Sequence, residues 1–386
     1  MENLSQKVYR NVWNEIGKSE VEIEEKLRSI VDGFFFEEGQ KVYFPVGDDM
    51  AYIEDTGNID ARTEGMSYGM MICVQLDRKE EFDRIWKWAK TYMYMEDGEN
   101  EGYFAWSCKP DGTKNAYGPA PDGEEFFAMA LFFASHRWGD GEGIFNYSAE
   151  ARRLLSACLH KGENGRPGQP MWNHENHQIL FIPGSPFTDP SYHLPHFYEL
   201  FALWANEEDR PFWKEAARAS RAFLVTACHP KTGMNPEYAN FDGTPYKEAR
   251  FGRHDWFYSD AYRTAANIGL DFAWFSEDVG QTAAIPRLQY CLGVVNRDNP
   301  FVTYEIDGTR LDQPALHPVG LLATTAQGSL AVQENLANPV TAEGKLAREW
   351  AERFWNEPLR RGTRRYYDNC LSFFAFLALG GRYRIW

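Results

Sequence analysis

The sequence of 386 residues predicts an all-α fold, in which six inner and six outer helices form an (α/α)6 barrel with small strands in its loops. First, apolar residues recur at helical spacing in about twelve segments. Second, no linker, low-complexity block or repeat of fixed period divides the chain, so residues 1–386 are expected to form one domain. Third, alternate helices follow long loops rich in Gly, Pro and aromatic residues.

Local patterns justify the helices in turn. Ser19 and Glu22 form a capping-box pattern that opens a helix toward Phe36. An apolar stripe covers residues 82–93, and Asp122 with Glu125 forms a second capping-box pattern. Similar runs lie at about 64–77, 148–160, 191–205, 211–227, 260–275, 279–296, 315–333, 341–355 and 366–380. Short strands are expected around residues 41–44 and 103–107.

Every second helix follows a long loop, and we assign these helices, near residues 64, 122, 191, 260 and 315, to the inner ring. Inner helices that run parallel bring their N-termini together at one end of the barrel. That arrangement gathers five scattered side chains into one cleft: Glu64, Asp122, Tyr192, Asp260 and His317.

Composition excludes several classes of function. A net charge of −16 argues against a nucleic-acid partner, which requires clustered Lys and Arg. Six widely spaced cysteines without a C-x-x-C pair are expected to be reduced and buried. We find no secretory signal pattern and no apolar run of about 18 residues, so we expect a cytoplasmic protein that does not enter membranes. The oligomeric state stays open.

Paired carboxylates at one rim suit the hydrolysis of glycosidic bonds, and abundant Trp and Tyr suit stacking on sugar rings. Glu64 is the candidate proton donor if burial or the nearby charge of Asp122 raises its pKa. Asp260 is the candidate base, with Arg263 at i+3 as an ion-pair partner, and Asp255 competes for the role. Two of these acids also have an alternative interpretation without a catalytic role. Glu64 fits an ordinary first-turn residue that complements the helix dipole, and Asp122 fits an ordinary N-cap.

Other residues give weaker signals. Two H-x-x-H spacings, at 174–177 and 193–196, lack the further ligands of a zinc site, so no metal is expected. Trp106 and Trp172 are candidate sugar-stacking platforms or, alternatively, loop anchors. Without a dinucleotide, Walker or nucleophile-elbow motif, no cofactor is expected.

Three motifs in order resemble glycoside hydrolase family 8, namely those at residues 62–70, 120–125 and 258–263. The resemblance runs from about Tyr52 to the C-terminus and implies an (α/α)6 barrel with an inverting mechanism. It implies that Glu64 is the proton donor, Asp260 the base and Asp122 the residue that distorts the sugar. It further implies that Tyr192 holds the nucleophilic water and Trp106 stacks beside the cleavage point. Arg62 and Arg263 are candidate substrate contacts within the motifs.

Within the family, the sequence most resembles exo-acting members that release xylose from the reducing end of xylo-oligosaccharides of three or more units. The telling segment is Leu316-His317-Pro318. The resemblance implies that it closes one end of the cleft and that His317 contacts the reducing-end hydroxyl, whereas the plain interpretation is an ordinary helix start. The alternatives are an endo-acting xylanase, glucanase or chitosanase of the family, a sugar 2-epimerase on the same barrel, or a non-catalytic sugar-binding protein.

Overall fold

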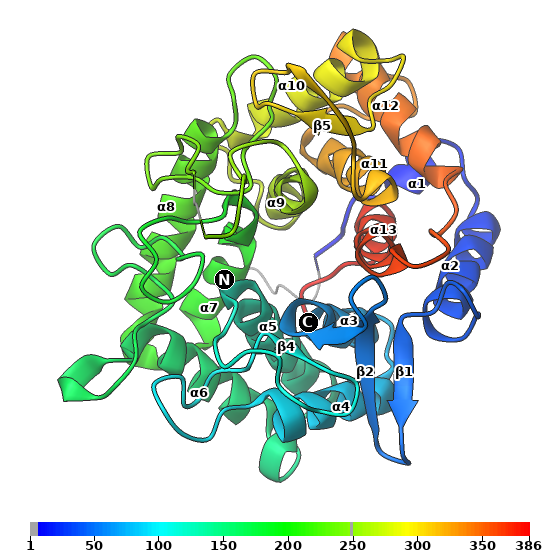
Figure 1. Cartoon of the computed structure of the whole chain (residues 1–386). Coiled ribbons are helices and arrows are strands. Elements are labelled where there is room, and N and C mark those ends of the chain that lie inside the picture. The colour runs from blue at the N-terminus through cyan, green and yellow to red at the C-terminus, as the bar shows by residue number, and fades with distance from the viewer. Residues whose placement is uncertain (1–6, 248–249) are drawn as a thin grey trace.

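The computed structural model describes residues 7–247 and 250–386, and these form two concentric rings of helices (Figure 1). The inner ring consists of α3 (Thr63–Gln75), α5 (Pro121–Trp138), α7 (Pro195–Trp204), α9 (Arg263–Phe275), α11 (Pro318–Gln327) and α13 (Arg365–Leu379). The outer ring consists of α2 (Glu20–Phe35), α4 (Lys79–Trp88), α6 (Tyr147–His160), α8 (Arg210–Ala227), α10 (Ala284–Tyr290) and α12 (Ala342–Trp355). The short α1 (Val12–Glu15) precedes them. The predicted (α/α)6 barrel is confirmed.

Each inner helix contacts the next, and α13 closes the ring by packing against α3. Because the inner helices are surrounded by other elements, they are buried on nearly all sides, and every residue of α13 from Tyr366 to Leu379 is buried. The outer helices keep one apolar face and one charged face, as expected of helices that meet solvent. The sequence pattern located α13 but did not assign it to the inner ring.

Several inner helices begin later than the patterns suggested. Short 3-10 turns precede two of them, Pro190–Tyr192 before α7 and Ser259–Tyr262 before α9. The expectation that Asp122 is an N-cap is wrong, because Pro121 occupies the first helical position of α5 and the cap residue is Ala120. The capping box at Ser19 is confirmed, since its backbone N donates to the Glu22 carboxylate at 2.9 Å.

Four short antiparallel strands form one sheet in the order β1 (Tyr43–Val46), β2 (Met50–Asp55), β3 (Asp60–Arg62) and β4 (Ser107–Cys108). A second pair consists of β5 (Val302–Tyr304) and β6 (Arg310–Pro314). The strand β3 leads directly into α3, and the backbone N of Thr63 donates to the carbonyl of Trp106 at 2.9 Å. This pairing places the Trp106 loop beside the first turn of α3.

All six cysteines are unpaired and buried, as the sequence predicted. Within residues 7–247 and 250–386, no helix is both long enough and apolar enough to cross a bilayer.

Candidate active site

A cavity of about 910 Å³ opens at the end of the barrel where the inner helices begin. Its size is near the upper limit of roughly 300–1,000 Å³ for small-molecule sites, which suits an oligosaccharide. Residues at or just before the start of all six inner helices line it: Glu64, Asp122, Tyr192, Asp260, His317 and Tyr366. The convergence of the N-termini therefore brings together the five side chains expected from the sequence.

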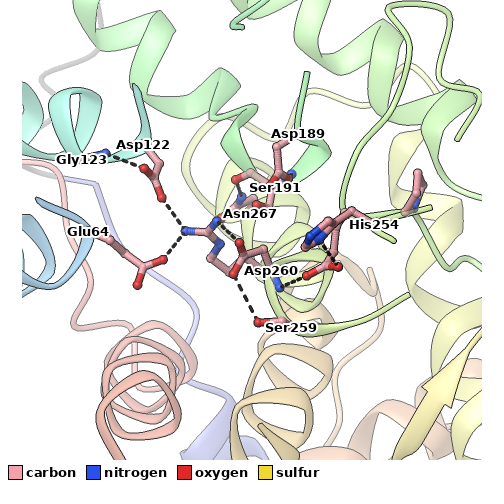
Figure 2. Close-up of polar contacts among 12 residues, drawn as sticks. Glu64, Asp122, Gly123, Asp189, Ser191, His254, Ser259, Asp260 and Asn267 are labelled. Carbon is pink, nitrogen blue, oxygen red and sulfur yellow. Dashed lines mark hydrogen bonds and ion pairs between the residues drawn. The ribbon is translucent and has the colours of Figure 1, made fainter. Parts of the chain in front are cut away.

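The guanidinium group of Arg263 lies between the acids and is only 4% exposed. Its Nη1 is 2.9 Å from Glu64 Oε2 and 2.9 Å from Asp122 Oδ2, and it donates to the hydroxyl of Tyr68 at 2.8 Å. Its Nη2 is 3.8 Å from Asp260 Oδ2. Figure 2 shows Glu64 and Asp122 directed toward this shared centre, with Asp260 on the opposite side. One cation thus faces three carboxylates.

Burial raises the pKa of Glu64 to about 8. The positive charge of Arg263 opposes this shift, while the negative charges of Asp122 and Asp260 add to it. Tyr366 donates a hydrogen bond to Glu64 Oε1 at 2.7 Å, which favours the ionised form and lowers the pKa. Glu64 is consequently a carboxyl group that keeps its proton at neutral pH.

Asp122 is the second residue of α5 and is buried beside Glu64. Burial raises its pKa, against the opposing charge and hydrogen bond of Arg263. Its Oδ1 accepts a hydrogen bond from the backbone N of Gly123 at 2.9 Å, and its Oδ2 faces Arg263. Both oxygens are therefore held, and the carboxyl group has a fixed orientation at the cavity wall.

Asp260 is the most exposed of the three acids, with 34% of its side chain accessible. It belongs to the 3-10 turn before α9, and the preceding Ser259 has a positive φ of 37°. The competing acid, Asp255, does not line the cavity and forms ion pairs with Arg253 at 2.9 Å and Lys247 at 3.3 Å. The geometry therefore favours Asp260 over Asp255 as the acid that meets solvent.

The buried side chain of Glu237 supports the Asp260 turn from behind. Glu237 accepts hydrogen bonds from His254 Nδ1 at 2.8 Å, from Trp256 Nε1 at 2.9 Å and from the backbone N of Asp260 at 3.4 Å. Burial raises the pKa of Glu237 to about 7, although its hydrogen bond to His254 opposes the shift. Figure 2 shows His254 on the Asp260 side of the site.

Aromatic and basic side chains form the cavity walls. The indole of Trp106 is 36% exposed, and the guanidinium of Arg62 lies 5.3 Å from its ring centre. Arg62 is itself held by ion pairs of 3.1 Å with Asp55 and 3.1 Å with Asp60. At another wall, Leu316 and His317 line the cavity. The cavity thus has the flat indole of Trp106 in one wall and the imidazole of His317 in another.

Comparison with known proteins identifies the fold's family. The sequence matches the model of glycosyl hydrolases family 8 over residues 47–380. The chain belongs to family 8. It is 56% identical over 380 residues to a reducing end xylose-releasing exo-oligoxylanase of Halalkalibacterium halodurans, covering 98% of this chain and 94% of that relative. A solved structure of Rex8A from Paenibacillus barcinonensis, complexed with xylose, has 55% identity and a TM-score of 0.94 and covers 99% of this chain and 98% of that one.

Three expected substrate contacts of this family 8 chain need correction. Trp172 is fully buried, where it packs edge-on against Tyr198 and Trp213, and it does not line the cavity. Arg263 does not line the cavity either, because it lies beneath the acids. Pro318 begins α11 behind the wall that Leu316 and His317 present.

The histidine spacings also have a structural explanation. His193 is buried between the hydroxyls of Thr188 at 3.0 Å and Ser220 at 2.8 Å, and His174 contacts the carbonyl of Leu159 at 2.8 Å. Among the residues that the structure describes, no group of three or more His, Cys, Asp or Glu side chains is arranged to hold a metal ion.

The sequence analysis missed Tyr366, Glu237 and His254, all of which line the cavity. The signal for Tyr366 was available, since the helix at 366–380 follows an outer helix and should occupy the inner ring. Glu237 and His254 lie in a long irregular segment between α8 and α9, where no periodic pattern marks a side chain that faces a cavity.

We expect Glu64→Gln to stabilise the folded protein at alkaline pH but not at acidic pH. A carboxyl group with a raised pKa stabilises the folded state below its unfolded pKa, and this stability is lost as the pH rises through the folded pKa of about 8. Glutamine avoids that loss. Between pH 5 and pH 8.5, the free energy of unfolding of the variant relative to the parent should increase by roughly 1–4 kcal/mol.

Urea denaturation at the two pH values measures this difference. Glu25→Gln, at an exposed position of α2, is the matched control and should give a difference that does not depend on pH. An equal effect of Glu64→Gln at both pH values would show that Glu64 is ionised at neutral pH.

Proposed function

We propose that this chain is an inverting exo-oligoxylanase, which hydrolyses β-1,4-xylo-oligosaccharides of three or more units and releases xylose from the reducing end. The observation that carries the proposal is a cavity lined by a buried acid whose raised pKa favours its protonated form and by an accessible carboxylate, with an imidazole in its wall. The two relatives named above, which share more than half of their residues with this chain, are both named as reducing-end xylose-releasing exo-oligoxylanases.

Glu64 is the proton donor in this proposal. A general acid must hold its proton at the working pH and release it to the leaving oxygen, and a pKa of about 8 meets the first requirement. The hydrogen bond from Tyr366 stabilises the carboxylate that forms once the proton has been transferred.

Asp260 is the general base and activates the water. Its exposure allows it to meet a water molecule, and Tyr192 lines the cavity at 5% exposure to hold that water in place. Both Glu64 and Asp260 lie within 3.8 Å of one guanidinium group. That limits the separation of the two carboxylates to roughly 9 Å, which is compatible with the 6.5–9.5 Å of inverting enzymes.

The other contacts position the sugar. Asp122, with a fixed orientation between Gly123 and Arg263, is placed to hold sugar hydroxyls and favour a distorted ring. Trp106 supplies the stacking face, and Arg62 holds the indole in position from one side. Leu316 and His317 form the wall that stops the chain beyond one xylose unit, so that hydrolysis occurs at the end of the oligosaccharide.

Xylotriose labelled at its reducing end tests the function. We expect labelled xylose and unlabelled xylobiose, and proton NMR in the first minutes should show the α-anomer at the new end of xylobiose, since inversion of a β-linkage gives an α product. The Glu64→Gln variant should lose at least about 1,000-fold in kcat, while Glu25→Gln should be unaffected.

Different products would support other functions. Labelled xylobiose or mixed products from longer chains would indicate an endo-acting enzyme. Interconversion of a free sugar with its 2-epimer that survives Glu64→Gln would indicate an epimerase. Binding without turnover would indicate a sugar-binding protein.

The pH dependence of kcat/KM tests the acid separately. Activity should fall above a pH of about 8, as Glu64 loses its proton. Tyr366→Phe removes a hydrogen bond that favours the ionised form, so it should move this alkaline limit upward by roughly one pH unit. Tyr383→Phe is the matched control, because the Tyr383 hydroxyl is buried without a hydrogen-bond partner in the described part of the chain. An unchanged limit in Tyr366→Phe would contradict the assignment of Glu64.

We further propose that residues 1–386 act as one catalytic domain in the cytoplasm. Six buried, unpaired thiols support a reducing compartment. The net charge of −16 supports a neutral oligosaccharide rather than a nucleic acid as partner. Fractionation of the source cells should place xylotriose hydrolysis in the cytoplasmic fraction.

A further inference from the structure

The wall residue His317 is held from behind by a buried carboxylate. Its Nδ1 lies 3.0 Å from Oδ2 of Asp368, which is fully buried on α13. The other oxygen, Oδ1, accepts a hydrogen bond of 2.7 Å from the backbone N of Gly320 in the first turn of α11. Asp368 therefore joins the start of α11 to the imidazole that faces the cavity.

Arg360 completes the arrangement. Its Nη1 donates to the same Asp368 oxygen at 2.6 Å and to the backbone carbonyl of Leu316 at 2.9 Å. The carboxylate thus already has a cation as its partner, and it does not require a protonated imidazole to balance its charge. The same guanidinium holds the backbone of the wall in place.

These contacts determine which nitrogen of His317 carries a proton. A carboxylate whose two oxygens both accept hydrogen bonds can only accept from the imidazole, so the proton must be on Nδ1. In the neutral ring, Nε2 then has a free lone pair. Since His317 lines the cavity, this lone pair is available to accept a hydrogen bond from a ligand.

We propose that Asp368 and Arg360 are positioning residues that select a free reducing end by fixing His317 as a hydrogen-bond acceptor. This inference rests on the proposed release of xylose from the reducing end. The O1 atom of a terminal xylose carries a hydrogen and can donate to Nε2. The O1 atom of an internal xylose is part of a glycosidic bond, has no hydrogen and cannot donate. The chemistry of one ring nitrogen therefore distinguishes an end from an internal unit, in addition to the steric effect of the wall.

Two substrates isolate this contact. Xylotriose and its analogue in which the reducing-end O1 hydroxyl is replaced by hydrogen differ by one donor and add no bulk. We expect the parent protein to prefer xylotriose in kcat/KM by about 100-fold or more, because sites built to bind a hydroxyl strongly reject analogues that lack it.

Asp368→Asn should reduce this preference to less than about 10-fold. The amide has one acceptor oxygen for the donors of Gly320, Arg360 and His317, so the contacts that hold the proton on Nδ1 of His317 cannot all be kept. Arg360→Gln should reduce the preference as well, whereas Arg360→Lys, which keeps the charge, should retain most of it. Arg361→Gln, which removes an exposed ion pair with Glu37 close by, is the control and should leave the preference unchanged.

A purely structural role would lower kcat/KM for both substrates equally and leave their ratio intact, and that result would overturn the proposal. Nitrogen-15 NMR of the histidine side chains, with His317→Asn to assign the signal, gives a second test that does not depend on activity. A proton on Nδ1 of His317 in the parent is expected, and a proton on Nε2 would overturn the proposal. If the parent does not release labelled xylose from xylotriose, the proposed function fails instead, and the NMR result still reports on the hydrogen bond.

Discussion

The site depends on one guanidinium group that is buried among acids. Arg263 contacts Glu64 and Asp122 at equal distances of 2.9 Å. Two buried carboxylates and one cation are electrically balanced only when one carboxyl group keeps its proton, because unpaired charge is costly away from water. Burial raises the pKa of both carboxyl groups, and because that of Glu64 reaches about 8, we assign the proton to Glu64. A neutral acid beside a fixed carboxylate is thus a consequence of charge balance, and the proposed chemistry uses it directly.

The barrel fold determines where the charged side chains of the site point and how deeply they are buried. Parallel inner helices place their first turns at one end, so residues from position 64 to position 366 meet in one cavity. A helix N-terminus favours an ionised carboxylate. For Glu64, burial outweighs that preference, which is why its pKa is raised although it lies in the first turn of α3.

The sequence was sufficient to predict the barrel and most of the acids because both are local signals. Helical periodicity located the helices, and carboxylates at the starts of apolar runs identified Glu64, Asp122 and Asp260. Contacts between distant segments were harder to predict. Spacing suggested Asp260, three residues earlier, as an ion-pair partner of Arg263, yet the closer partners of Arg263 come from α3 and α5. Likewise, nothing in the loop around Trp172 distinguished an indole in the core from one that faces the cavity.

The helix α13 connects the acid to the wall. Residues two positions apart on a helix point in nearly opposite directions, because each residue turns about 100°. Tyr366 therefore faces α3, where it donates to Glu64, while Asp368 faces α11, where it holds His317. Since α13 lies between α3 and α11 in the ring, one helical turn fixes the position of the proposed proton donor, Glu64, relative to the wall residue His317. In the proposed function, the spacing between the bond that is cleaved and the sugar that is recognised is accordingly set by this helix, whose residues from Tyr366 to Leu379 are all buried.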